Sequence, residues 1–320
     1  MNQAKDVSCV ALVDKPVGPT SFEIVKKARQ GISEKVGHAG TLDPFASGLL
    51  LILVGRATRI SNLLMERSKT YEVVVQFGSI SSTADPTGEL RPTGVRTTEK
   101  EILEIIPIFH GRISQKVPLT SAVKVDGEAL YRKAHRGEIV DTPKREVIVH
   151  EFALLDFDAT TQQAKMLATT GSGTYVRALS EDLGAALGVG AYAKELRRIR
   201  SGDLSVEDAF PPDELSKERY FAKGNGVLSI DEALSFLPAL LLKEREAHLA
   251  ENGSPFMWED AALWEVNKEV FAQDVLLATN NLGTMNCQGG KERFRVHGSR
   301  GLIAIYEKFA DKIRPLVVFP

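Results

Sequence analysis

One acidic residue, Asp43, stands in a segment whose composition suits a functional loop, GHAGTLDPFASG at residues 37–48. The glycines permit tight backbone around the carboxylate, and Pro44 keeps Asp43 on extended or turn backbone. Functional side chains are often carried by such loops. A carboxylate there can be a covalent nucleophile, a general base, a metal ligand or a turn former. The residue types alone leave these four roles open.

Three other side chains could act together with such a carboxylate. Tyr71, in the β-branched run TYEVVVQFG, is either a core aromatic or a stacking surface whose hydroxyl can take part in proton movement. Arg177 is either a surface residue early in a helix or a partner that keeps a carboxylate ionised. His38, five residues before Asp43, is either a binding residue or a structural histidine.

The cysteines and histidines do not indicate a metal site. Cys9 and Cys287 are far apart, and no CxxC pair is present. No two of the six histidines have the i, i+4 spacing of metal ligands on a helix. These residues therefore indicate no metal site, and the cysteines are typical of a reducing compartment. We expect no organic cofactor either.

Basic residues gather in two runs. The first surrounds Tyr131 and comprises Arg132, Lys133, Arg136, Lys144 and Arg145; the second comprises Lys194, Arg197, Arg198 and Arg200. Basic residues interleaved with aromatics suit contacts to a phosphate backbone, although a charge run is also typical of a solvated face. The formal net charge is -2, so any nucleic-acid contact must come from such local patches.

Hydrophobic patterning predicts the elements that position these residues. A helix follows Thr20 or Ser21 and ends at Gly31, with Phe22, Ile24, Val25 and Ala28 facing inward. The continuous apolar run 49–55 predicts a strand buried on both faces. Further expected elements are strands at 70–78, 146–157 and 163–170, helices near 98–106 and at 175–188, and a short helix or helix-to-strand junction at 191–200.

The composition changes near residue 230. SIDEALSFLPALLL reads as a final helix or linker, and the chain end RGLIAIYEKFADKIRPLVVF alternates apolar strands with a charged turn, which predicts a small β-rich appendage. The fold class expected is α+β, with a mostly antiparallel mixed main sheet flanked by helices and loops. No stretch approaches the roughly 18 apolar residues of a membrane helix, so we expect a cytoplasmic protein without a membrane partner.

The segment GHAGTLDPFASGLL resembles the signature of the TruB family of pseudouridine synthases, with Gly40, Leu42, Asp43, Pro44, Ala46 and Gly48 filling or bordering the motif. Six ordered motifs over residues 10 to about 205 extend the resemblance. Besides the signature they are DKPVGPTS, KTYEVVVQFG followed by ADPTGE, VPLTSAVKVDGEALYRKAHRGE, GSGTYVRALSEDLG and LRRIRSG. The resemblance implies the pseudouridine synthase fold with a PUA-like C-terminal domain.

The resemblance also implies roles for particular residues. Asp43 is the nucleophile, Arg177 its partner, and Tyr71 the active-site tyrosine. In substrate binding, His38 helps to open the RNA loop, Leu196 packs under the base, and Asp85 is an acidic position near the site, unless it is only a turn residue. Gly40 and Leu42 belong to the signature, and Lys124, Arg132, Arg136 and Arg145 to an RNA-gripping thumb at about 116–146.

We therefore predict an isomerase that flips a uridine out of RNA and converts it to pseudouridine, with U55 in the T-loop of tRNA as target. The expected partner is the T-arm of tRNA, with no obligatory protein partner and a monomeric state. The expected domains are a catalytic domain at 1–235 and a PUA-like RNA-binding domain at 236–320, in which 254–300 shows little resemblance.

Other readings stay open at this point. An aspartate-nucleophile hydrolase of a glycosidic bond would usually pair two carboxylates, and no second one stands in the loop. A tRNA-binding or folding protein without catalysis is a second alternative. A third is the guide-RNA-dependent branch of the same family, found in archaea and eukaryotes.

Overall fold

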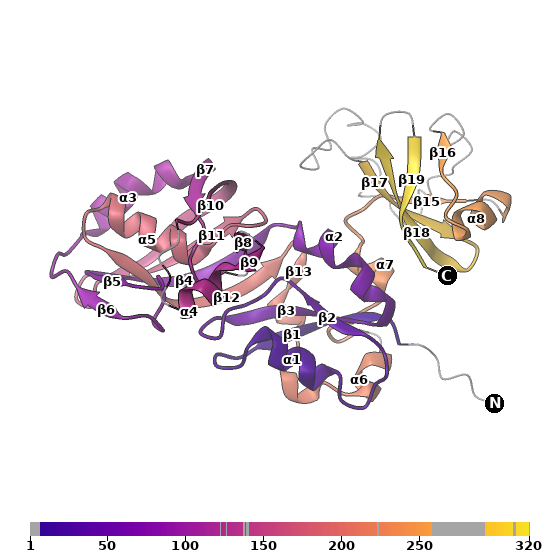
Figure 1. The fold of residues 1–320 in the computed structure, drawn as a ribbon, viewed down its shortest axis with the longest axis horizontal. Coiled ribbons are helices and arrows are strands. Elements are labelled where there is room, and N and C mark those ends of the chain that lie inside the picture. Colours follow the sequence, from indigo (N-terminus) through magenta and orange to yellow (C-terminus); the bar gives the residue numbers. More distant parts are fainter. Residues whose placement is uncertain are drawn as a thin grey trace.

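The structure is a computed structural model that describes residues 7–257 and 292–319, apart from residues 122, 126, 137, 139, 140, 223, 243, 310 and 311. Its main feature is a ten-stranded sheet with the order β14-β1-β3-β12-β4-β11-β10-β7, to which β2 and β13 add at β3 and β12 (Figure 1). The strands are β1 (Cys9–Lys15), β2 (Val36–Ala39), β3 (Ser47–Val54), β4 (Lys69–Phe77), β7 (Gly111–Lys116), β10 (Lys144–Asp158), β11 (Gln163–Thr170), β12 (Ala191–Ser201), β13 (Leu204–Ser205) and β14 (Val227–Leu228).

The pairing of this sheet confirms the predicted fold class. Neighbouring strands run antiparallel except β3 and β12, which run parallel over Ser47–Gly48 and Arg197–Arg198. The loop that carries Asp43 ends where β3 starts, so it lies directly at this parallel junction. The sheet therefore brings residues of β12 beneath a loop that precedes them by about 150 positions.

Strand β3 is buried on both faces, as its apolar run predicts. One core cluster contains Leu50 and Ile52 together with residues of α1 (Ser21–Ala28), α5 (Val176–Ala186) and α6 (Lys217–Phe221). The opposite cluster contains Leu49 and Leu51 together with residues of α2 (Ser61–Met65) and α7 (Ile230–Ala233). Figure 1 shows α1 and α6 on one side of β1 and β3, and α2 and α7 on the other.

Three sequence predictions were wrong. Residues 191–200 form strand β12, because pairing with both β4 and β3 outweighs the local helical pattern. Helix α1 ends at Ala28, before Gly31, and Phe22 is exposed although Thr20 caps the helix as predicted. The stretch after residue 229 holds only the four-residue helix α7 before strand β15 (Ala239–Leu241) begins.

The segment predicted to be a thumb is less loop-like than its composition indicates. It contains the short pair β8 (Lys124–Val125) and β9 (Glu128–Ala129), followed by α4 (Leu130–His135). A second small pair joins β5 (Ser79–Ser81) and β6 (Leu90–Pro92), ahead of α3 (Glu99–Ile105).

The end of the chain forms a separate five-stranded sheet, which we call the C-terminal sheet. It follows the order β15-β17-β18-β19-β16, with β16 (Phe256–Met257), β17 (Glu292–Gly298), β18 (Gly301–Phe309) and β19 (Lys312–Val318), and α8 (Glu244–Glu251) packs on it. Figure 1 shows it beside the main sheet rather than within it. Residues 258–291, most of the stretch with little family resemblance, lie outside the described residues. Among the described helices, none is long and apolar enough to cross a membrane.

Candidate active site

The loop between β2 and β3 is fixed by hydrogen bonds on both sides of Asp43. The Ser21 hydroxyl accepts from the Leu42 N–H and donates to the Leu42 carbonyl, both at 2.9 Å, and Leu42 is buried. After Asp43, the Pro44 carbonyl accepts from the Gly18 N–H at 2.8 Å. The Asp43 side chain keeps 36% of its surface exposed, so it faces solvent from a rigid loop.

Arg177 faces this carboxylate from the first turn of α5. Its side chain is only 3% exposed, and Nε lies 3.0 Å from Asp43 Oδ2. Nη1 of the same guanidinium lies 2.8 Å from Asp85 Oδ2. Arg177 is therefore not the surface residue that its place in the helix allowed, and it bridges two acids from separate loops.

Asp85 is both a turn residue and a partner of Arg177. Its Oδ1 accepts hydrogen bonds from the Thr83 hydroxyl at 2.7 Å and the Thr87 N–H at 2.9 Å, while Oδ2 accepts from Arg177. The side chain is 5% exposed. A buried carboxylate of this kind fixes the guanidinium that points at Asp43.

Opposing effects act on the Asp43 carboxyl. Burial has the largest effect and raises its pKa, and nearby Asp85 raises it further. Arg177 and Lys15 lower it, and the net shift is upward from the ordinary value. The ion pair with Arg177 therefore favours the charged form in a place where desolvation opposes it.

Beneath the loop lies Arg198, a residue that the sequence placed among possible phosphate contacts. It is 2% exposed, and Nε donates to the Leu49 carbonyl at 2.7 Å and Nη2 to the Gly40 carbonyl at 3.0 Å. Gly48 has a φ of +103°, and a Cβ there would lie 2.2 Å from the Arg198 carbonyl oxygen. This arginine supports the loop from inside and is unavailable to RNA.

Two buried lysines also surround the loop, and the sequence did not single out Lys69. Lys69 donates to the carbonyls of Leu64, Met65 and Arg67, at 3.2, 2.5 and 2.6 Å. Burial and nearby arginines lower its pKa to about 7. Lys15 donates to the carbonyls of Pro16 and Pro19, and burial lowers its pKa to about 8. The one sequence signal that could have identified Lys69 is a charged residue at the start of a predicted strand.

The other residues predicted to line the site come from β2, β4 and β12. Tyr71, half-buried against the core, is paired in register with Arg198. Leu196 precedes Arg198 by two positions, on the same face of β12, and is 8% exposed. His38 lies on β2 opposite Ile52 of β3, and its Nδ1 is buried without a hydrogen-bond partner among the described residues. Burial and Arg198 lower the pKa of His38.

The thumb residues come from a segment about 80 to 100 positions after this loop, and most of them are exposed. Arg136 pairs through both Nη atoms with Glu128, at 2.7 Å each, and through Nε with Glu138 at 2.6 Å. Arg132 on α4 and Arg145 on β10 are exposed. Lys124 belongs to β8, and its side chain is outside the described residues.

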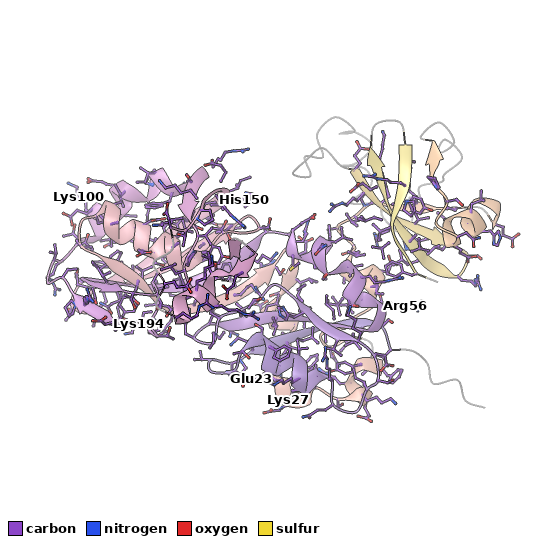
Figure 2. All side chains as sticks on the ribbon, in the orientation of Figure 1. Glu23, Lys27, Arg56, Lys100, His150 and Lys194 are labelled. Atoms are coloured by element: carbon purple, nitrogen blue, oxygen red, sulfur yellow. The ribbon has the colours of Figure 1, made fainter. Side chains whose placement is uncertain are left out.

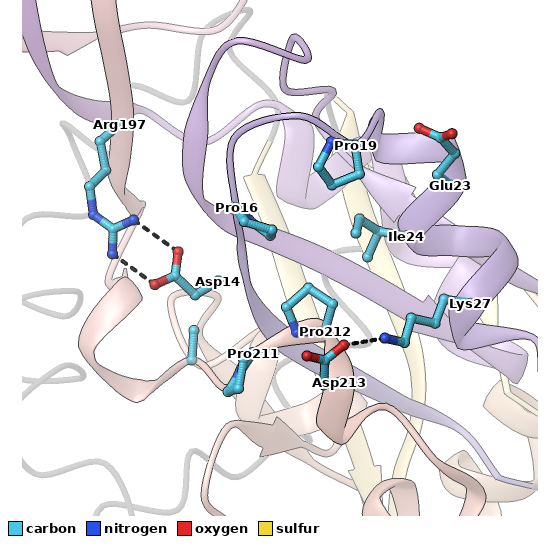
Figure 3. A pocket seen from close by; sticks show the side chains of 11 residues that line it. Asp14, Pro16, Pro19, Glu23, Ile24, Lys27, Arg197, Pro211, Pro212 and Asp213 are labelled. Carbon is cyan, nitrogen blue, oxygen red and sulfur yellow. Dashed lines mark hydrogen bonds and ion pairs between the residues drawn. The ribbon is translucent and has the colours of Figure 1, made fainter.

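A cavity of about 680 Å³ opens elsewhere, between the end of β1, α1 and residues 209–213 (Figure 3). Two ion pairs line it, Arg197 with Asp14 at 2.8 Å and Lys27 with Asp213. Its remaining charged residue, Glu23, accepts hydrogen bonds from Thr20. None of the predicted site residues lines it. Among the described residues, no cluster of three or more His, Cys, Asp or Glu side chains is placed to hold a metal.

Comparison with known proteins places this site in a family. Residues 27–176 match the N-terminal domain of the TruB family pseudouridylate synthases, and 177–239 match the tRNA pseudouridylate synthase B C-terminal domain. The tRNA pseudouridine synthase B of Pseudomonas fluorescens is 37% identical over 265 residues, 80% of this chain and 86% of that protein. An enzyme of that name from Bacillus cereus is 39% identical over 253 residues, 76% of this chain and 82% of that protein.

A solved structure shows the same fold at lower identity. The crystal structure of the archaeal box H/ACA sRNP Nop10-Cbf5 complex contains a chain that is 22% identical, with a TM-score of 0.65 over 94% of this chain and 79% of that chain. The fold and the two matched domains agree with one another. This chain belongs to the TruB family of pseudouridylate synthases.

Proposed function

We propose that this protein converts U55 in the T-loop of tRNA to pseudouridine. The observation that carries the proposal is the ion pair between Asp43 and buried Arg177, at 3.0 Å, in the loop with the family signature. The names of the relatives support tRNA as the substrate. The isomerisation breaks the C1′–N1 bond of uridine and joins C1′ to C5 of the same uracil, while C5 loses a proton and N1 gains one. There is no net oxidation, so the reaction needs no redox cofactor, and we expect no metal or organic cofactor.

Asp43 acts on the nucleotide directly. Its carboxylate either attacks C1′ of the ribose or C6 of the uracil, or it stabilises positive charge at C1′. Arg177 favours the ionised carboxylate and fixes its direction, and buried Asp85 fixes Arg177 in turn. The half-exposed Asp43 side chain can reach a nucleotide in front of the loop.

The surrounding residues form the pocket for a uridine that has left its stack. Tyr71 stacks on the base and its hydroxyl lies in the path of proton movement, while Leu196 provides an apolar floor. His38 binds the RNA where the loop opens. Gly40 and Leu42 shape the backbone beside Asp43.

RNA outside the pocket is gripped by the thumb at about 116–146, with Lys124, Arg132, Arg136 and Arg145 contacting phosphates. The catalytic domain spans 1–235, and a PUA-like RNA-binding domain spans 236–320. The position of the C-terminal sheet, all of whose strands follow residue 235, supports this division. We further propose that the enzyme acts as a monomer in the cytoplasm, without an obligatory protein partner.

The first test replaces the nucleophile. Asp43→Asn keeps the shape of the side chain and removes its charge, so pseudouridine formation on an unmodified tRNA transcript should fall by at least about 10³-fold. The dissociation constant for tRNA should stay within about twofold. Asp213→Asn, an exposed acid outside the site, is the matched control and should keep wild-type turnover. Turnover retained by Asp43→Asn would overturn the assignment.

The same assay separates the alternatives. Release of free uracil without rejoining would identify a hydrolase, and binding without turnover by the wild-type protein would identify an RNA-binding protein. Turnover by purified protein on tRNA, with no guide RNA added, would exclude the guide-dependent branch. Chemical mapping of the product gives the position of the modified nucleotide.

A further inference from the structure

The base of the thumb is attached to the helix that carries Arg177. Gln115, on β7 and 2% exposed, accepts a hydrogen bond from the Tyr175 N–H at 2.8 Å and donates one to the Tyr175 carbonyl at 3.1 Å. Tyr175 is the N-cap residue of α5, two positions before Arg177. The strand that leads into the thumb therefore fixes the start of this helix.

A second contact reaches the guanidinium itself. The hydroxyl of Thr120 accepts a hydrogen bond from Arg177 Nη1 at 2.7 Å, and the Thr120 carbonyl accepts one from Nη2 at 3.4 Å. Nη1 also donates to Asp85 Oδ2 at 2.8 Å and to the Thr83 carbonyl at 3.0 Å. Three oxygens thus share two hydrogens of one nitrogen, so the orientation of the guanidinium depends on where Thr120 lies.

Thr120 belongs to the short connection between β7 and β8, at the root of the thumb. The Val117 N–H donates to the Pro143 carbonyl at 3.0 Å and closes this root, and the Thr120 side chain is half-buried. Arg177, in contrast, sits on a fixed helix and is buried. Movement of the thumb would therefore reach Arg177 through Thr120.

We propose that Thr120 is a positioning residue that couples RNA binding by the thumb to the direction of the Arg177 guanidinium, and through it to the Asp43 carboxylate. The inference rests on the proposed function of this site. Thr120 holds Nη1 in the orientation that points Nε at Asp43, and RNA bound to the thumb keeps Thr120 in that position during the reaction. Binding energy from a remote contact is used in this way to align the reacting group.

The test uses the full-length protein, unmodified tRNA transcript and single-turnover kinetics. Thr120→Val removes the hydroxyl and keeps the volume and the backbone carbonyl, so the rate of the chemical step should fall about tenfold or more while the dissociation constant for tRNA changes less than about twofold. Thr120→Ser restores the hydroxyl and should recover most of the rate. Thr58→Val, which removes a threonine hydroxyl that bonds only to the Gly55 carbonyl in the described structure, is the control and should keep the wild-type rate.

A double-variant cycle separates coupling from a merely structural effect. Arg132→Ala in the thumb should lower the rate in the wild-type background, and this loss should shrink by at least about threefold when Thr120 is already valine. Equal losses in both backgrounds would overturn the coupling, as would an unchanged rate in Thr120→Val or a failure of serine to restore it.

The outcomes also distinguish this inference from the proposed function. A wild-type protein that forms no pseudouridine refutes both. An active wild type with an equally active Thr120→Val variant refutes only the coupling and leaves Asp43 and Arg177 in their roles.

Discussion

At the scale of single residues, three basic side chains are buried around the loop that carries Asp43. Lys15, Lys69 and Arg198 are all buried, and each donates to backbone carbonyls. Arg198 bonds Gly40 in the loop, Lys15 bonds Pro16 and Pro19, and Lys69 bonds residues at the end of α2. Among the described residues, their acceptors are backbone carbonyls and not carboxylates. These hydrogen bonds hold the three side chains in place, and Arg177 is the residue that forms the ion pair with Asp43.

Lys69 makes the stability of the protein depend on pH. Its pKa is about 7 in the folded protein, against 10.5 ordinarily, so between about pH 7 and 10.5 the folded chain lacks a proton that the unfolded chain keeps. The unfolded state then binds more protons, and the free energy of unfolding rises with pH by up to about 1.4 kcal/mol per pH unit.

Denaturant unfolding at several pH values checks this. In Lys69→Met, the free energy of unfolding should no longer show the increase with pH that Lys69 causes, whatever the effect of the substitution on absolute stability. Lys100→Met, at an exposed lysine of α3, should keep it (Figure 2). Equal pH slopes for the two variants would contradict the prediction.

At the scale of elements, the thumb of the RNA-free protein is closed on itself. Arg136 forms ion pairs with Glu128 and Glu138 that link β9 to the end of α4. Exposed pairs of this kind contribute only about 0–1 kcal/mol, so phosphates can replace the carboxylates at little cost. The same arginine can therefore order the free thumb and contact bound RNA.

This gives a prediction about salt. Arg132→Ala with Arg136→Ala should weaken tRNA binding and reduce the slope of log Kd against log salt by about 1.5, since each lost phosphate contact removes about 0.7–0.9. Arg91→Ala with Lys100→Ala removes two exposed cations elsewhere and should leave the slope unchanged. If both double variants show the wild-type slope, the thumb does not contact the RNA backbone.

At the scale of the whole molecule, the C-terminal sheet shares a core with the main sheet. Ile305 and Phe319 belong to the same buried cluster as Leu12 and Leu51. Arg59 donates to the Val318 carbonyl at 2.6 Å, and Arg293 pairs with Glu66. A shared core of this kind favours a fixed placement of the C-terminal sheet over a flexible tether.

Removing side-chain volume from this shared core should lower the free energy of unfolding. Ile305→Ala should lower the free energy of unfolding by about 2–5 kcal/mol, because the buried side chain leaves a cavity between the two sheets. Leu316→Ala, at an exposed position of β19, should cost less than about 1 kcal/mol. Chemical denaturation measures both, and similar costs at the two sites would show that the sheets are not packed together.

The sequence by itself determined that Asp43 lies on a loop and that a buried strand follows it. Pro44 and the glycines predict the loop around Asp43, and the apolar run at 49–55 predicts the buried strand that follows it. Both predictions succeed because turn formation and strand formation depend mainly on the backbone and burial preferences of residues adjacent in the sequence. The family resemblance added Arg177 as the partner of Asp43, although only the structure shows the two in contact.

Tertiary structure alone decided what the charged residues do. Arg198 and Arg197 are adjacent in one basic run, yet β12 turns Arg198 under Gly40 and leaves Arg197 beside Asp14. Successive side chains of a strand point to opposite faces, so the register with β3 and β4 decides which arginine is buried. A charge pattern in the sequence does not give the register of a strand. For that reason, only the folded structure shows that Lys69 and Arg198 bond backbone carbonyls and that Thr120 contacts Arg177.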